Sequence, residues 1–137
     1  MRAVLDVNVL ASALLSRSGT PAKLVRAWLD GSYELIVSAS LLDELERTLA
    51  YPKVAKRVLP DEASEFLALL GEEAEVLADP PQASDVRSVD PDDDDLIALA
   101  RMARAVLVSG DGDLLGLAGR IPVLSPREFL SLLDKQS

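Results

Sequence analysis

Carboxylate side chains stand at four separate places in the sequence where a metal site could form. Asp6 and the turn from Asp111 to Asp113 follow short apolar runs, and two acidic clusters lie at 43–46 and 92–95. The chain contains neither histidine nor cysteine. This absence excludes histidine bases, Ser-His-Asp triads and thiolate sites. Any metal would therefore be held by oxygen ligands, which favour Mg²⁺ or Mn²⁺ over Zn²⁺.

The run of four aspartates at 92–95 begins an apolar helical pattern and has two interpretations. Proline at the first turn and acids near the positive end of the helix dipole fit any well-capped, solvated helix start. Helical periodicity, however, places Asp93 on the same face as Ile97 and Ala100, while its neighbours in the run turn away from that face or lie between. Asp93 is therefore the member of the run that we expect to face a buried site.

The acidic cluster at 43–46 lies on a predicted helix whose leucines at 41, 45 and 49 form an apolar stripe. Ser40 can cap this helix, with Asp43 in a box-like arrangement. Glu44 and Glu46 both lie at the edges of the stripe, and periodicity does not choose between them. Exposed acids on an amphipathic helix are the simpler alternative.

These acids must be positioned by the secondary structure between them. Five short apolar segments predict strands, at 2–5, 33–37, 75–77, 105–108 and 121–124. Helical patterns between them predict an α/β fold, with a central parallel β-sheet flanked by α-helices on both faces and right-handed crossovers. Asp6 and Asp111 would then share the rim at the carboxyl ends of the strands, where open α/β sheets bind ligands. Alternatively, Asp6 only caps the helix after it.

Local signals predict several helix ends and one core residue. Thr20 is the expected N-cap of a helix with Pro21 at its first position, and Gly31 ends that helix. Trp28 has the spacing of a core residue, which we favour over a role as a base-stacking platform.

Basic side chains that could contact a phosphate backbone are few. A short basic helix is predicted at 53–58, and a solvated face is its default interpretation. The candidates for nucleic-acid binding are Lys53, Lys56, Arg57, Arg17 and Lys23.

Length and composition predict one domain over residues 1–137 that buries a core without disulfides. A hydrophobic content of 49% argues against disorder. The net charge of −9 argues against a general nucleic-acid-binding surface, but not against a nuclease whose acids gather around metal ions. We expect no signal peptide or membrane span, and the lack of cysteine suits a reducing cytoplasm.

Four segments, in order along almost the whole chain, together resemble PIN-domain ribonucleases. The resemblance is to the toxin components of bacterial and archaeal toxin–antitoxin pairs in particular. No single segment is specific, so the resemblance depends on their combination. The segments are Val4–Leu10, Ser38–Leu45, Asp90–Asp94 and Val108–Leu114.

The resemblance implies which residues form the site. Asp113 often assists as a further metal ligand, and Asn8 and Ser109 match polar positions that line the site. The four consecutive aspartates depart from the commonest pattern, so Asp92 or Asp94 could take the place of the third acid. The four matched acids would be catalytic residues and metal ligands: Asp6, Glu44, Asp93 and Asp111.

The resemblance also implies an activity and partners. We expect a Mg²⁺- or Mn²⁺-dependent endoribonuclease that cleaves single-stranded or looped RNA and leaves 5′-phosphate and 3′-hydroxyl ends. One or two ions would offset the repulsion between the carboxylates and orient the attacking water. The expected partners are the RNA substrate, a cognate antitoxin protein and a second copy in a homodimer, with no membrane.

Two other interpretations compete with this one. A haloacid-dehalogenase-like phosphatase also has an aspartate after its first strand and a late Gly-Asp pair, here Gly110-Asp111. It would need a second aspartate as general acid where this chain has Asn8, which cannot donate a proton in that way. The other alternative is a non-enzymatic protein-interaction module whose acids have no catalytic role.

Overall fold

The computed structural model describes residues 1–80 and 91–136, without the side chains of residues 91 and 92. This part of the chain contains five strands and eight helices. The strands are β1 (Arg2–Leu5), β2 (Glu34–Ser38), β3 (Glu75–Leu77), β4 (Val106–Val108) and β5 (Val123–Leu124). The helices are α1 (Val7–Leu15), α2 (Thr20–Leu29), α3 (Ala39–Ala50), α4 (Pro52–Ala55), α5 (Pro60–Glu73), α6 (Pro91–Ala103), α7 (Gly112–Leu115) and α8 (Pro126–Gln136).

The strands form one parallel sheet in the order β3-β2-β1-β4-β5. The chain first builds the sheet in one direction from β1 and then crosses to β4 on its other side. Leu5 at the end of β1 is paired with Val108 at the end of β4. The residues that follow these two strands, Asp6 and Ser109, are therefore neighbours at the rim.

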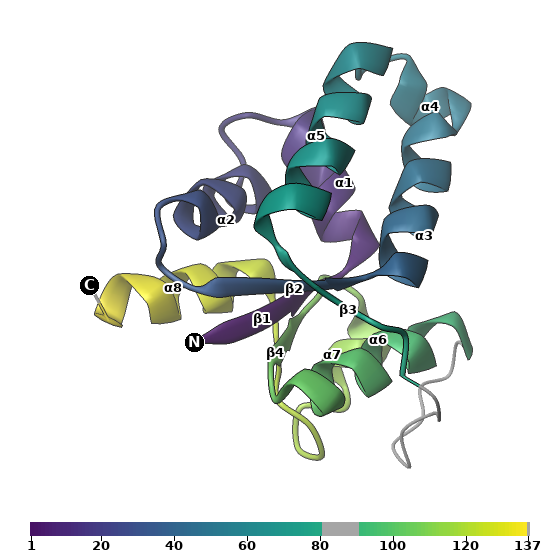
Figure 1. Ribbon diagram of the computed structural model, residues 1–137. Helices are drawn as coiled ribbons and strands as arrows, with labels where there is room; N and C mark the ends of the chain where they lie inside the picture. Colours follow the sequence, from purple (N-terminus) through teal and green to yellow (C-terminus); the bar gives the residue numbers. More distant parts are fainter. Residues whose placement is uncertain (81–90, 137) are drawn as a thin grey trace.

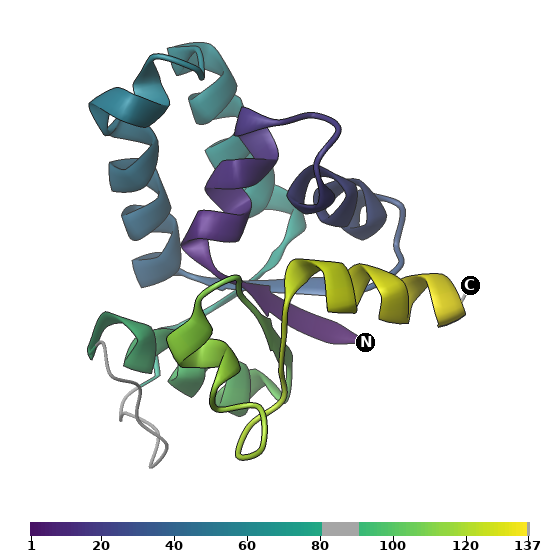
Figure 2. The same cartoon turned by 180° about the vertical axis from the view of Figure 1, so that it is seen from behind.

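Helices cover both faces of this sheet, as predicted. Figures 1 and 2 show α1, α2, α3 and α5 on one side and α6 and α7 on the other. Right-handed crossovers explain this division, because strands added in opposite directions place their connecting helices on opposite faces. The last helix, α8, packs against α2 and β5. No helix in the described ranges is long and apolar enough to cross a membrane.

The central strands and one face of each long helix form the core. Residues 3–5 and 35–37 are buried because both faces of β1 and β2 are covered, which explains their continuous apolar sequence. Trp28 is 7% exposed, so its predicted place in the core is confirmed. Tyr33 donates its hydroxyl hydrogen bond to the Leu24 carbonyl at 2.8 Å and packs edge-on against Phe129.

The structure corrects several predicted element ends. Ser38, not Ser40, caps α3: its hydroxyl accepts a hydrogen bond from the Leu41 N–H at 3.2 Å. The helix with Pro21 near its start has Gly19 as N-cap, so Thr20 lies inside it. The prediction also missed α7, whose four residues are too short to show a helical period.

Candidate active site

Asp6 is the buried centre of the rim at the carboxyl ends of the strands. Asp6 is 6% exposed, and it stands between the last residue of β1 and the first of α1. The Asn8 N–H donates a hydrogen bond to Asp6 Oδ1 at 3.3 Å, so Asp6 does cap α1. Capping uses one of its oxygens, and the other faces β4.

Ser109 connects Asp6 to the second acid of the rim. Its hydroxyl donates to Asp6 Oδ2 at 2.8 Å and accepts from the Asp111 N–H at 3.0 Å. Asp111 in turn caps α7, because its Oδ1 accepts from the Asp113 N–H at 2.9 Å. Ser109 is completely buried. A continuous chain of hydrogen bonds therefore holds the turn after β4 against the end of β1.

This contact lies at the topological switch point of the sheet. The crossover directions reverse between β1 and β4, and open parallel sheets bind ligands outside the carboxyl ends of such a strand pair. Asp6 and Asp111 thus come together where the sequence predicted them.

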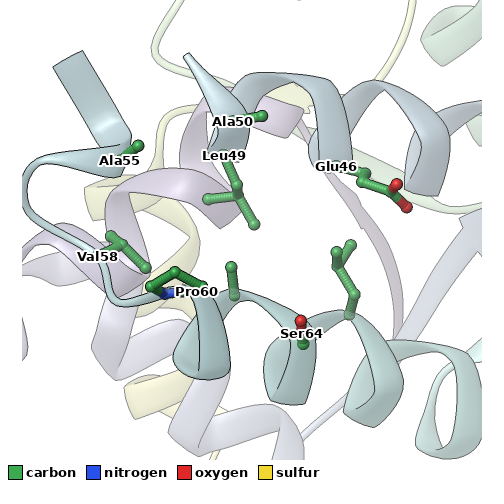
Figure 3. Close-up of a pocket in the computed structure, with 9 residues that line it drawn as sticks. Glu46, Leu49, Ala50, Ala55, Val58, Pro60 and Ser64 are labelled. Carbon is green, nitrogen blue, oxygen red and sulfur yellow. The ribbon is translucent and has the colours of Figure 1, made fainter. Parts of the chain in front are cut away.

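Glu44 and Glu46, which periodicity could not separate, lie in different surroundings. Glu44 lines a groove of about 730 Å³ together with Asn8, the neighbour of Asp6. Glu46 lines a mainly apolar cavity of about 540 Å³ between α3 and α5, with Leu49 and Val58 (Figure 3). Of the two acids, Glu44 is the one that shares a lining with a residue of the rim.

Asp93 stands in the first turn of α6, a helix that packs against β1, β2 and β4. Its Oδ2 is a buried atom although the residue as a whole is half-buried. Asp95 is exposed, and Asp94 is half-buried like Asp93. The inward orientation expected for Asp93 agrees with this pattern, whereas the alternative acid Asp92 has its side chain outside the described residues.

The electrostatics of Asp6 suit a divalent cation. Burial raises the pKa of the Asp6 carboxyl, and the nearby charge of Asp111 raises it further, although the Ser109 hydroxyl and the Asn8 N–H oppose this shift. Ionised Asp6 is thus costly to bury beside a second carboxylate. A bound Mg²⁺ or Mn²⁺ would favour the ionised form, and carboxylate oxygens are the ligands these ions prefer.

Joint metal binding by the four acids stays a prediction. Within residues 1–80 and 91–136, no group of three or more acidic side chains is arranged as a ready-made metal site. The side chains that the structure ties together are Asp6, Ser109 and Asp111, and Asp113 is joined to Asp111 through its backbone. Glu44 lines the same groove as Asn8, whose backbone N–H donates to Asp6.

The basic candidates belong to different elements and have different surroundings. Lys53 lines the same groove as Asn8 and Glu44. Arg57 donates a hydrogen bond to the Leu15 carbonyl at 3.2 Å, at the end of α1 remote from Asp6. Lys56 is exposed. Arg17 and Lys23 are also exposed, in the α1–α2 connection and on α2.

Sequence reasoning missed two residues of the groove, Arg47 and Tyr51. A signal for them existed, since residues 44, 47 and 48 lie on one helical face and Tyr51 follows one turn later. The leucine stripe of the same helix dominates its pattern and masks this polar stripe.

Comparisons with known proteins agree with this fold. The chain is 25% identical over 145 residues to MJ1680, an uncharacterized protein of Methanocaldococcus jannaschii. This alignment covers 98% of this chain and 93% of that protein. PAE2754 from Pyrobaculum aerophilum has a similar structure, with a TM-score of 0.68, 20% identity and coverage of 98% and 95% of the two chains.

A second solved structure is VapBC2 from Rickettsia felis bound to a DNA fragment from their promoter. Its TM-score is 0.60 at 14% identity, with 91% of this chain and 98% of that chain covered. A family model of the PIN domain matches residues 2–113, which is most of the sequence. PIN domains are generally nucleases. The chain therefore belongs to the PIN domain family.

Proposed function

We propose that this protein is a Mg²⁺- or Mn²⁺-dependent endoribonuclease that cleaves single-stranded or looped RNA. The observation that supports this most is the buried Asp6 carboxylate, hydrogen-bonded through Ser109 to the turn of Asp111 at the switch point of the sheet. A buried acid whose pKa is raised beside a second acid is typical of a functional site rather than of a stabilising contact.

The residues have distinct roles in this proposal. Ser109 and the Asn8 N–H each hold one oxygen of Asp6, which fixes the orientation of its carboxylate. The N-terminus of α1 adds a favourable dipole for its negative charge. A bound divalent ion would supply Lewis-acid chemistry at the attacked phosphate and lower the pKa of a water. The residues that would hold it are Asp6, Glu44, Asp93 and Asp111, with Asp113 assisting.

The recessed position of Asp6 favours a flexible substrate. Asp6 and Ser109 are buried at the rim, and the groove lined by Asn8 and Glu44 begins beside them. A single strand or a loop can bend to bring one phosphate into such a rim, whereas the bases and backbones of a regular duplex are held in place. Hydrolysis there would leave a 5′-phosphate and a 3′-hydroxyl.

We also infer that the protein is the toxin of a toxin–antitoxin pair and forms a homodimer. The fold shared with VapBC2 from Rickettsia felis supports this role. Expression of the chain alone should arrest growth, and co-expression of a small protein encoded beside it should relieve the arrest and co-purify. Normal growth with no co-purifying partner would contradict the toxin role, and sedimentation as a monomer would contradict the dimer.

The nuclease proposal is tested by cleavage of single-stranded RNA with and without Mg²⁺. Asp6→Asn, Glu44→Gln and Asp93→Asn should each lower the metal-dependent rate by roughly 1,000-fold, because metal catalysis supplies several kcal/mol. Arg2→Ala, at the opposite edge of the sheet, is the matched control and should cleave at the wild-type rate.

Full activity in all three acidic variants would refute the assignment. Turnover of p-nitrophenyl phosphate should be measured in parallel. Robust turnover with intact RNA would instead support the phosphatase alternative.

A further inference from the structure

The groove beside the rim, which we name the α3–α4 groove, combines cationic, aromatic and acidic side chains. It has a volume of about 730 Å³. Its helical part is one face of α3, and its far wall is α4. The lining residues are Asn8, Glu44, Arg47, Thr48, Tyr51, Pro52, Lys53 and Val54.

The α3–α4 groove is continuous with the proposed catalytic acids. Asn8, which lines it, donates its backbone N–H to Asp6 Oδ1, and Glu44 is itself one of the candidate metal ligands. A polymer whose phosphate reaches Asp6 therefore has this groove directly beside it. The groove leads from Glu44 toward Tyr51 and Lys53, at the junction of α3 and α4.

Two positive charges lie in the α3–α4 groove of a chain whose net charge is −9. Arg47 and Lys53 are both exposed. Neither forms a salt bridge with another residue in the part of the chain that the structure describes. Their charges are thus available for an anionic ligand, and the phosphate groups of a nucleic-acid backbone have the matching negative charge.

Tyr51 is the aromatic side chain of the α3–α4 groove, and it is 60% exposed. Trp28 and Tyr33, by contrast, are packed in the core. An exposed ring next to two cations is the composition of sites that bind single-stranded nucleic acid, where bases stack on the ring and cations hold the backbone.

We propose that the α3–α4 groove binds the single-stranded RNA segment next to the cleaved phosphate. Tyr51 stacks on a base of this segment, and Arg47 and Lys53 bind its phosphates. This assignment rests on the proposed nuclease function and accounts for single-strand preference, because the bases of a duplex are already stacked on one another and are not available to Tyr51.

The stacking contact and the phosphate contacts can be separated by measuring RNA binding. The probe is a single-stranded oligouridylate with a 5′-fluorescein label, and its binding is followed by fluorescence anisotropy in the presence of Ca²⁺. A gel shows whether the probe stays intact during the measurement. Tyr51→Ala should weaken binding about 10-fold and leave the salt dependence unchanged, whereas Tyr51→Phe should bind like wild type. Arg47→Ala and Lys53→Ala should each reduce the slope of log affinity against log salt by about 0.7. A hairpin duplex probe should bind more weakly.

Lys135→Ala is the matched control, since Lys135 is an exposed lysine on α8, which Figure 1 shows on the side of the molecule away from α4. It should change neither affinity nor slope. The groove assignment would be overturned if Tyr51→Ala bound the probe with wild-type affinity, or if neither Arg47→Ala nor Lys53→Ala changed the salt dependence of binding. Cleavage of RNA by the wild-type protein would still support the nuclease proposal in that case.

Two further outcomes are decisive. If the groove variants bind RNA normally but escape inhibition by a partner protein, the groove is a protein-docking surface and the assignment is wrong. If wild type neither binds nor cleaves RNA, the nuclease proposal fails and the groove assignment fails with it.

Discussion

The charged residues at the two ends of the strands, which we call the amino-terminal and carboxyl-terminal edges of the sheet, differ in how their charges are paired. At the amino-terminal edge, Arg2 pairs with Glu34 at 2.9 Å and with Glu75 at 2.8 Å, and its Nε donates to the Ala103 carbonyl. One cation thus ties the starts of β1, β2 and β3 to the end of α6. At the carboxyl-terminal edge, Asp6 and Asp111 have like charges and are linked through Ser109.

This difference separates a stabilising cluster from the cluster that we propose to be functional. Opposite charges at an exposed edge hold strands in register at little cost in desolvation. Like charges at a buried edge oppose folding, and such an arrangement persists where ligand binding compensates for it. The amino-terminal edge therefore serves the fold, and we assign the carboxyl-terminal edge to chemistry.

Removing the link at the carboxyl-terminal edge should have the largest effect. Ser109→Ala deletes the hydrogen bond to Asp6 Oδ2 and the one from the Asp111 N–H. We expect Mn²⁺ affinity, measured by calorimetric titration, to fall about 10- to 100-fold, as for other residues that orient metal ligands. The free energy of unfolding should fall by about 1 kcal/mol.

Ser125→Ala provides the control for that loss of stability. Ser125 accepts a hydrogen bond from the Glu128 N–H at the start of α8. Its removal should destabilise the protein by about 1 kcal/mol as well, but leave Mn²⁺ affinity unchanged. Equal loss of metal affinity in both variants would show that general destabilisation explains the result.

The charge of Asp6 should make the metal-free protein less stable as pH rises. Burial raises the pKa of Asp6 in the native state, so its contribution to stability is greatest below its ordinary pKa of 3.8 and is lost as pH rises through the raised native value. In EDTA, Asp6→Asn should therefore unfold at higher urea than wild type at pH 7. The difference should shrink toward pH 4, and a constant difference would contradict this explanation.

Breaking the amino-terminal edge should have the smallest effect. Arg2→Ala removes both ion pairs and the bond to Ala103. Because these pairs are largely exposed, we expect only a small fall in Tm, visible in low salt and weaker in high salt. Mn²⁺ affinity should not change, and a lower affinity would mean that the two edges are coupled.

The centre of the sheet could be predicted from the sequence because β1, β2 and β4 are largely buried. Residues 2–5 and 105–108 are almost entirely apolar, and this composition identifies covered strands without any structural information. Local details could not be predicted in the same way. Ser38 and Ser40 are equally good caps by type, and only the end of β2 at Ser38 decides between them.

The site was predictable in part for similar reasons. Asp6 and Asp111 follow strands, so the parallel sheet alone brings them to one rim. Helical periodicity could not distinguish Glu44 from Glu46, and the choice of Glu44 came from the resemblance alone. The surroundings of the two acids depend on how α3 packs against α1 and α5. Ser109 was expected at the site from the resemblance, but its hydrogen bonds to Asp6 and to the Asp111 N–H could not be predicted, because they depend on the pairing of Leu5 with Val108.

Titration of the metal-free protein with Mn²⁺, followed by thermal unfolding, tests most directly whether the acids at the carboxyl-terminal edge act as one cation site. Wild type should gain stability with a saturable dependence on Mn²⁺, since a ligand that binds only the native state raises Tm. Asp6→Asn should show no such gain. Equal stabilisation of both proteins, or none in wild type, would contradict the metal site on which the account depends.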